Sequence, residues 1–372
     1  IAKRKKKQTI KTSQIVMAII IIILIAIIWY FGKPYINEYL DDHNHQDEQG
    51  NIVSGELAIH FLELGNKYTG DSVYIKAGDT DILIDAGSRG NSADDIGAYL
   101  DQYVTDDTLE YVIATHAHQD HIAGFVGTSS VTGIFEQYVC ETIIDFPMTN
   151  ATSKVYQNYV EKRDAEIASG ATHYTALECY NNENGAKKVY EISEGIELEI
   201  LYNYYYDHKT SNENEYSVCV MINQGSKHFL FTGDLEAEGE EKLVEYNDLP
   251  VVEVFKAGHH GSYTASTDAL LSVIKSKIVC VCCCAGSDEY TDNSDNMFPA
   301  QAFISRVCKY TENIYVTTII SDNELGFTSM NGNIVVTSNT TGVSVNCSNN
   351  NTILKETEWF KKNRTMPSAW AS

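Results

Sequence analysis

The chain has 372 residues, enough for one large or two modest domains, and its 43% hydrophobic and 21% charged residues exclude wholesale disorder. Its formal net charge is −24, yet residues 1–33 hold seven basic residues and no acid, so the remainder holds 20 basic against 51 acidic residues. A body this acidic excludes tight electrostatic binding of a nucleic acid. Any phosphate chemistry therefore needs a metal ion or a local basic pocket.

The N-terminal part of the sequence reads as a membrane anchor. Residues 15–31, "IVMAIIIIILIAIIWYF", carry no charge and are just long enough to cross a hydrocarbon core as a helix. The preceding "KRKKK" run puts the N-terminus in the cytoplasm by the positive-inside rule. A cleaved secretory signal is the alternative, but no small-residue cleavage site follows the run. We therefore predict a basic terminus and single transmembrane anchor over 1–32, a polar linker over 33–55, and an extracellular body.

The body shows two series of strand and helix patterns. They are separated by a polar stretch at 171–195, which we interpret as an irregular insertion. Strands are expected at 56–64, 72–77, 81–87 and 109–115, and later at 195–208, 215–223, 227–234, 250–262, 277–283 and 313–319. Helices are expected at 92–104, 151–170, 236–246, 267–276 and 299–310, with a hairpin over 325–347. Two such series sharing one core predict an α/β domain over 56–347, with two sheets sandwiched between helices. Residues 348–372 are expected to form a peripheral tail.

The cysteines favour packing over metal chemistry. Four of the nine lie in "CVCCC" at 280–284, a run that reads as a buried strand. Adjacent strand residues point to opposite faces of a sheet, so these four thiols are poorly placed to coordinate one zinc ion tetrahedrally. We expect these side chains to fill the core.

The stretch "THAHQDHIAG" at 115–124 concentrates ligand-type side chains in one turn after an apolar strand. His116 and His118 are two positions apart, so in an extended chain their side chains point to the same side. Their imidazole nitrogens can then coordinate one metal ion. Asp120 and His121 follow where the chain begins to curl, so they aim at a neighbouring point. Two adjacent points predict two divalent metal ions. Histidine with carboxylate suits zinc, with manganese or iron as alternatives.

Two further segments place similar side chains just after strands. "FTGDLE" puts Asp234 where it is suited to bridge two ions, and "KAGHHGS" contributes His259 and His260. Open sheets collect ligands at the edge where their strands end. The three segments together predict one metal centre at that edge.

The motifs resemble those of a known family. "HAHQDH" matches the HxHxDH signature of the metallo-β-lactamase superfamily. "ILIDAG", "FTGD" and "GHHGS" look like the hydrolase domain of ComEC-type competence proteins, and "LELGNKYTGDS" at 62–72 resembles that group's Gly-Gln-Gly-Asp turn with extra residues inserted. The resemblance covers about residues 56–320. It implies an αββα metallo-β-lactamase-like sandwich with a dinuclear metal site.

The resemblance also implies roles for individual residues. His116 and His118 would hold metal one, Asp120 and His121 metal two, and Asp234 would bridge. His260, which directly precedes a glycine, is preferred over His259 as a ligand of metal two. His259 would then lie close by as a catalytic residue, with Lys256 or Ser262 helping to bind substrate. Asp120 would orient the nucleophile, and Asp85 would steady the histidine turn.

One expected ligand has no obvious match, because members of this superfamily usually add a histidine between the first cluster and the bridging aspartate. His173, His208 and His228 are the candidates. We choose His208 because it follows a strand end. Water or another oxygen ligand is the alternative.

The resemblance implies a hydrolase that uses a hydroxide activated by two metal ions. A phosphodiesterase, such as a nuclease, is the first hypothesis, with nucleic acid as a substrate. The second is a hydrolase of cell-envelope material such as phosphocholine esters, and a β-lactamase-type ester or amide hydrolase is a further form of it. A non-catalytic surface module is the third. DNA import by this chain alone is not expected, because we find one predicted anchor in the sequence and not the multi-span channel of competence proteins.

Overall fold

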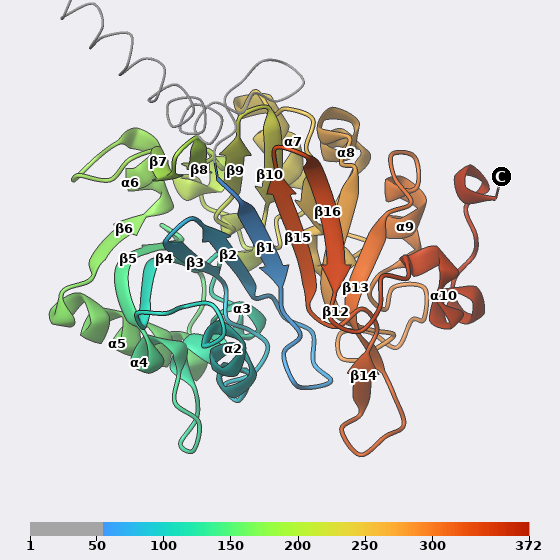
Figure 1. The fold of residues 1–372 in the computed structure, drawn as a ribbon, viewed down its shortest axis with the longest axis horizontal. Coiled ribbons are helices and arrows are strands. Elements are labelled where there is room, and N and C mark those ends of the chain that lie inside the picture. The colour runs from blue at the N-terminus through green and yellow to red at the C-terminus, as the bar shows by residue number, and fades with distance from the viewer. Residues whose placement is uncertain (1–54, 372) are drawn as a thin grey trace, which may run out of the picture.

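The computed structural model describes residues 55–371 (Figure 1). The predicted anchor and nearly all of the predicted linker lie outside these residues. No helix within residues 55–371 is long and apolar enough to cross a membrane.

The described strands form two sheets of eight. The first has the order β16–β15–β1–β2–β3–β4–β5–β6, with β3 to β6 parallel to one another. Its strands are β1 (Leu57–Phe61), β2 (Val73–Ala77), β3 (Thr80–Ile84), β4 (Thr108–Ile113), β5 (Val139–Asp145), β6 (Thr172–Thr175), β15 (Ile334–Asn339) and β16 (Gly342–Cys347).

The second sheet has the order β14–β13–β12–β11–β10–β9–β8–β7, with β10 to β13 parallel to one another. Its strands are β7 (Val189–Ser193), β8 (Ile196–Ile200), β9 (Val220–Gln224), β10 (Lys227–Phe231), β11 (Val254–Lys256), β12 (Ile278–Ala285), β13 (Ile314–Ile320) and β14 (Phe327–Ser329). The predicted closing hairpin is therefore split: β15 and β16 join the first sheet and β14 joins the second.

Helices cover the outer faces of both sheets, α2 to α5 beside the first and α7 to α10 beside the second (Figure 1). They are α2 (Ser92–Leu100), α3 (Gln119–Val126), α4 (Ile134–Gln137), α5 (Lys154–Ser169), α6 (Ala176–Asn181), α7 (Ala237–Tyr246), α8 (Asp268–Ile274), α9 (Gln301–Val307) and α10 (Glu358–Asn363). Short 3₁₀ turns are η1 (Tyr204–Tyr206), η2 (Glu213–Tyr216), η3 (Gly258–Gly261), η4 (Leu354–Glu356) and η5 (Ser368–Trp370). The two-sheet α/β architecture confirms the prediction.

Strand β12 shows how the sequence builds the layers. Its side chains alternate, so Cys280 and Cys282 belong to the core between the sheets while Val281 and Cys283 belong to the core under the outer helices. All four are buried. The cysteine-rich run is thus core packing, as predicted, because a strand covered on both faces needs small apolar residues throughout.

The structure corrects two expectations about the body. The stretch 171–195, interpreted as irregular, contains β6, α6 and β7, because β6 pairs with β5 and β7 pairs with β8 at the sheet edges. The segment after Cys347 is not peripheral: four of its apolar side chains are buried in the second core, namely Leu354, Trp359, Phe360 and Trp370. Both segments are locally polar, so their sequence patterns do not predict ordered elements. Strand pairing and packing with distant parts of the chain stabilise them instead.

Candidate metal centre

The histidine turn and its partners lie at one edge of the two sheets. Parallel strands end at the same edge, so the residues after β3 and β4 meet there, as do those after β10 and β11. Asp71 lies at the same edge although it comes before a strand. It precedes β2, which runs antiparallel to β3, so the start of β2 lies beside the end of β3. Its amide donates to the Asp120 carbonyl at 3.0 Å and its carbonyl accepts from the Gly87 amide at 2.8 Å.

Two glycines allow the turns to touch. A Cβ on Gly87 would lie 1.5 Å from the main-chain oxygen of Asp120, and one on Gly124 would lie 2.3 Å from that of Ala86. Larger residues would push the histidine turn away from the loop after β3. These contacts fix α3, which starts with Gln119 inside the motif, against the first sheet.

Four histidines converge on one carboxylate oxygen, Oδ2 of Asp234. The distances from this oxygen to Nε2 are 3.1 Å for His121, 3.3 Å for His260, 3.8 Å for His259 and 3.9 Å for His116. A carboxylate surrounded in this way is suited to bridge two cations.

The opposite nitrogens of the two innermost rings are held by other groups. Nδ1 of His121 lies 2.7 Å from Oδ2 of Asp85, and Nδ1 of His260 lies 3.0 Å from the carbonyl of Cys282. An acceptor at Nδ1 fixes the tautomer that carries its proton there, which leaves Nε2 free as a ligand. Asp85 therefore has the steadying place that the resemblance implied.

Asp71 is a site residue that the sequence reasoning did not assign. Ligand atoms of Asp71, His121, Asp234 and His260 lie within 4.8 Å of one another, and all four residues are buried. The turn that resembles Gly-Gln-Gly-Asp contains Asp71, so the signal was present in the motif. Lys256, expected to help bind substrate, is instead buried and paired with Asp71.

The charges of the cluster call for cations. The four carboxylates of Asp71, Asp85, Asp120 and Asp234 are buried, while Lys256 is the buried lysine beside them. Uncompensated buried charges cost several kcal/mol each. The Asp71 oxygens already lie against Lys256 and Nδ1 of His260. Within residues 55–371, three other buried atoms of the cluster make no hydrogen bond: His121 Nε2, Asp234 Oδ1 and His260 Nε2. These unpartnered oxygen and nitrogen donors fit divalent metal ions.

The pKa values of the cluster agree with this need. Burial alone would raise the pKa of Asp234, but the neighbouring His121 and His260 hold it well below its usual range. Burial alone would lower the pKa of His121, but Asp234 and Asp85 raise it well above the ordinary value. The carboxylates thus favour positive charge on the rings, which metal ions supply in place of protons.

The outer side of the centre holds His116, His118 and His259. Nε2 of His116 lies 3.0 Å from Nδ1 of His118, which is exposed. His259 is 18% exposed, and its Nδ1 lies 3.1 Å from Oε1 of Glu236. His259 and His260 both adopt left-handed backbone with φ of 47° and 55°, a strain that aims two successive rings at the cluster.

A loop after β12 lies beside the centre. The Tyr290 hydroxyl donates to Oδ2 of Asp120 at 2.6 Å, and Nε2 of His260 lies 3.4 Å from the same oxygen. The ring of Phe298 lies between Tyr290 and His260, with centroids 5.5 and 5.9 Å away. Sequence reasoning did not identify Tyr290, because the residue lies far along the chain in a polar stretch without a motif.

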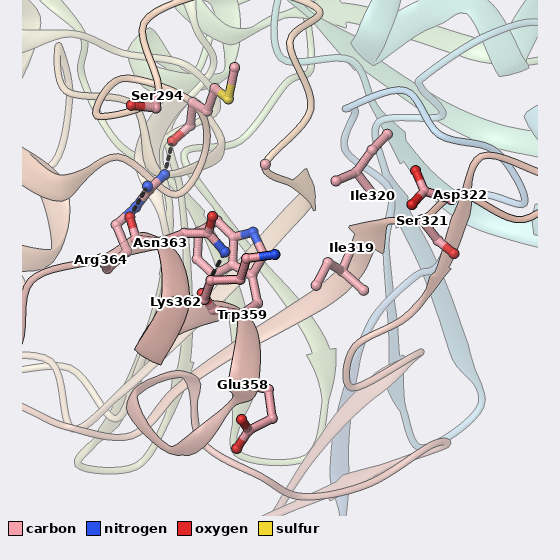
Figure 2. A pocket seen from close by; sticks show the side chains of 12 residues that line it. Ser294, Ile319, Ile320, Ser321, Asp322, Glu358, Trp359, Lys362, Asn363 and Arg364 are labelled. Carbon is pink, nitrogen blue, oxygen red and sulfur yellow. Dashed lines mark hydrogen bonds between the residues drawn. The ribbon is translucent and has the colours of Figure 1, made fainter.

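The C-terminal segment holds this loop in place. The guanidinium of Arg364 donates to the carbonyls of Met297 at 2.7 Å and Pro299 at 3.0 Å. Figure 2 shows Arg364 beside Trp359, on the side toward Ser294 of this loop. Arg364 also lies 4.6 Å above the ring of Trp359, beside a cavity of about 390 Å³. The residues on either side of Phe298 are therefore anchored by the last part of the chain.

The structure does not bring the chosen extra histidine to the centre. His208 is 45% exposed, stacks on Tyr204 with ring centroids 3.7 Å apart, and bonds Asp207. The other two candidates are also engaged elsewhere: His173 with Asp145 at 2.9 Å and His228 with Asn223 at 2.8 Å. The choice of His208 is corrected, because η1 turns the chain after β8 and leaves this side chain in solvent.

Comparison with known proteins agrees with the geometry. The family model described as the metallo-beta-lactamase superfamily matches residues 65–160 and 210–285, which include the histidine turn, Asp234 and the His-His pair. Recombination protein 2 of Haemophilus influenzae is 31% identical over 72 residues, which is 19% of this chain and 9% of that protein. The chain thus matches less than a tenth of that relative's length.

Solved structures with partial likeness include two metallo-β-lactamases. One from Cronobacter sakazakii with a HARLDQ motif has 13% identity and a TM-score of 0.32, covering 52% of this chain and 72% of that one. SMB-1 bound to 2-mercaptoethanesulfonate has 13% identity and a TM-score of 0.33, covering 58% and 81%. On the family match and its motifs, the chain is a metal-dependent hydrolase that belongs to the metallo-β-lactamase superfamily.

Proposed function

We propose that the chain is a phosphodiesterase whose metal centre acts outside the cell, tethered by the apolar run at 15–31. The observation that carries the proposal is the convergence of four histidine nitrogens on Oδ2 of Asp234, between 3.1 and 3.9 Å away. A shared carboxylate with histidines on two sides suits a pair of ions, and such pairs favour in-line displacement at phosphorus.

The residues divide between holding the ions and handling the substrate. His116 and His118 with Asp234 would hold one ion, and Asp120, His121 and His260 with Asp234 the other. Asp71 lies on the Nδ1 side of His260 and is paired with Lys256, so it would position the inner rings. Bound divalent ions acidify water and polarise the scissile phosphoryl group. In a site this acidic, the ions also let an anionic phosphodiester approach.

Asp120 and His259 are suited to the proton and water steps. Oδ2 of Asp120 accepts from the Tyr290 hydroxyl at 2.6 Å, so this carboxylate is fixed at the edge of the cluster where it can orient a water. His259 lies on the half-buried rim, with Nδ1 held by Glu236 and Nε2 facing the centre. A ring held in this way can pass a proton to a leaving group at Nε2.

A phosphocholine ester is the second candidate substrate. Tyr290 is 49% exposed and its ring pairs with that of Phe298, so aromatic surface lies beside the centre. Aromatic rings attract quaternary ammonium groups, and the acidic body favours a cationic headgroup.

The test uses the full chain purified in detergent and loaded with Zn²⁺ or Mn²⁺. We expect turnover of bis-nitrophenyl phosphate and of single-stranded DNA or a phosphocholine ester, and its loss in Asp234→Asn and His116→Ala. The exposed His208→Ala variant is the control and should match wild type. Turnover of nitrocefin alone would overturn the phosphodiesterase proposal, and activity unaffected by both site variants would place the reaction elsewhere.

A further inference from the structure

The two sides of the centre differ in their supply of ligands. On the inner side, Asp71, His121 and His260 surround Asp234. On the outer side, His116 and His118 have no third histidine from the intervening chain, because His173, His208 and His228 are bound elsewhere. His259, the remaining ring on this side, is assigned above to proton transfer. A metal position with His116, His118 and a bridging carboxylate then lacks one protein donor compared with the usual four-coordinate arrangement.

Asn214 has an unused oxygen in this neighbourhood. It lies in η2, is 6% exposed, and its Oδ1 is buried without a hydrogen-bond partner. A buried carboxamide oxygen without a partner is unfavourable, so it normally has a ligand, a water or a donor.

The orientation of this carboxamide is fixed by chemistry. Its Nδ2 donates to Oε1 of Glu236 at 3.0 Å, and the same oxygen accepts from the Thr264 hydroxyl at 2.9 Å. A carboxylate accepts hydrogen bonds and cannot donate them, so turning the amide over would set two oxygens against each other. Oδ1 of Asn214 therefore faces away from Glu236.

Three contacts place η2 and the two residues that follow it, Ser217 and Val218, against the metal centre. The Val218 amide donates to the Thr115 carbonyl at 2.9 Å, directly before the histidine turn, and the Asp234 amide donates to the Ser217 hydroxyl at 3.1 Å. Glu236, the partner of Asn214, also holds Nδ1 of His259 at 3.1 Å. The Asn214 carboxamide is thus joined through Oε1 of Glu236 to His259, one of the residues on the outer side.

We propose that Oδ1 of Asn214 is the oxygen donor that completes the outer metal position, in the place where a third histidine is absent. The proposal concerns the same centre as the phosphodiesterase proposal and rests on it for its catalytic meaning. An amide oxygen is a harder donor than an imidazole nitrogen. It shifts the preference of this position from Zn²⁺ toward Mn²⁺.

The test measures metal binding by the full chain, which is independent of any substrate. Zn²⁺ and Mn²⁺ are titrated separately against a competing chelator, and bound metal is counted after dialysis. We expect two ions in wild type. In Asn214→Ala, we expect one ion at unchanged affinity and a second weakened at least tenfold. In Asn214→His, the second position should recover Zn²⁺ and its preference for Zn²⁺ over Mn²⁺ should rise.

Asn223→Ala is the matched control. Asn223 also donates to a glutamate, Glu199, and contacts a histidine, His228, but its oxygen is already partnered and it lies in β9 away from the centre. This variant should bind both ions as wild type does. If Asn214→Ala does not fold, Asn214→Leu, which keeps the branching at Cγ without a donor oxygen, serves the same measurement.

Each outcome is decisive. Two ions at wild-type affinity in both Asn214→Ala and Asn214→His would overturn the proposal, even if phosphodiester turnover fell, because Asn214 would then act only by positioning Glu236 and His259. Selective loss of the second ion would support it, even in a protein that fails to cleave phosphodiesters. Failure of the two proposals is therefore distinguishable.

Discussion

Asp85 and Asp234 contact opposite nitrogens of the His121 ring. Oδ2 of Asp85 lies 2.7 Å from Nδ1, and Oδ2 of Asp234 lies 3.1 Å from Nε2. Asp85 itself adopts left-handed backbone with φ of 60° and accepts from the Thr115 amide and hydroxyl, each at 2.7 Å. One buried carboxylate thus fixes both the start of the histidine turn and the tautomer of its last ring.

Replacing Asp85 with Asn should weaken the centre without removing a metal ligand. The variant keeps the shape but loses the charged acceptor that fixes His121, so we expect metal affinity or turnover to fall about 10- to 100-fold. Chelator competition measures the affinity. The control is Asp81→Asn, since Asp81 begins the same strand region but pairs with Lys76 away from the centre. Equal effects of the two variants would contradict the prediction.

Metal binding should stabilise the fold, because the ions compensate buried carboxylates. At a free metal concentration about 100 times Kd, stability should rise by ~2.7 kcal/mol, seen as a higher Tm. His121→Ala should abolish most of this increase, whereas His208→Ala should retain it, because His208 is in solvent. A metal-dependent Tm that survives in His121→Ala would show that the stabilising ion binds elsewhere.

Tyr290→Phe should lower turnover while leaving metal content intact. The variant removes the hydroxyl that donates to Asp120, and burial with the adjacent Asp120 carboxylate raises the pKa of Tyr290, so it stays a donor at neutral pH. Loss of one hydrogen bond to a charged group corresponds to about tenfold or more in kcat/KM. Single-turnover kinetics and metal analysis on the same sample test it. Unchanged kinetics would remove Tyr290 from the site.

Arg364→Ala should loosen the loop around Phe298. The guanidinium supports the carbonyls on both sides of that residue, so we expect faster amide hydrogen exchange over 286–300 and a several-fold drop in turnover. Lys362→Ala is the control, since Lys362 is an exposed residue of the neighbouring α10. Exchange that rises equally in both variants, or throughout the protein, would indicate general destabilisation instead.

His60 should make stability fall at acidic pH. It is buried against the rings of Tyr74 and Tyr103, and burial lowers its pKa from 6.5 to about 4. A lowered histidine pKa contributes stability that is present above 6.5 and lost as pH falls toward 4. Between pH 7.5 and 5 the loss should be about 2 kcal/mol. Urea unfolding should give a smaller pH dependence for His60→Phe than for wild type; equal dependence would reject this assignment.

The sequence determined the local parts of this protein. Strand alternation and helix periodicity predicted most elements, because a side-chain period of two or 3.6 is a local property. The histidine turn revealed itself because several ligands lie within one short segment. Asp234 and the His259–His260 pair were found because each directly follows an apolar strand.

Only the tertiary structure decided which distant residues join that turn. Asp71 arrives through antiparallel pairing of β2 and β3, Tyr290 through a loop held by Arg364, and Asn214 through its hydrogen bond to Glu236. His208, which follows a strand end as a ligand would, points into solvent instead. Such placements depend on sheet order and long-range packing, which no short window of sequence encodes.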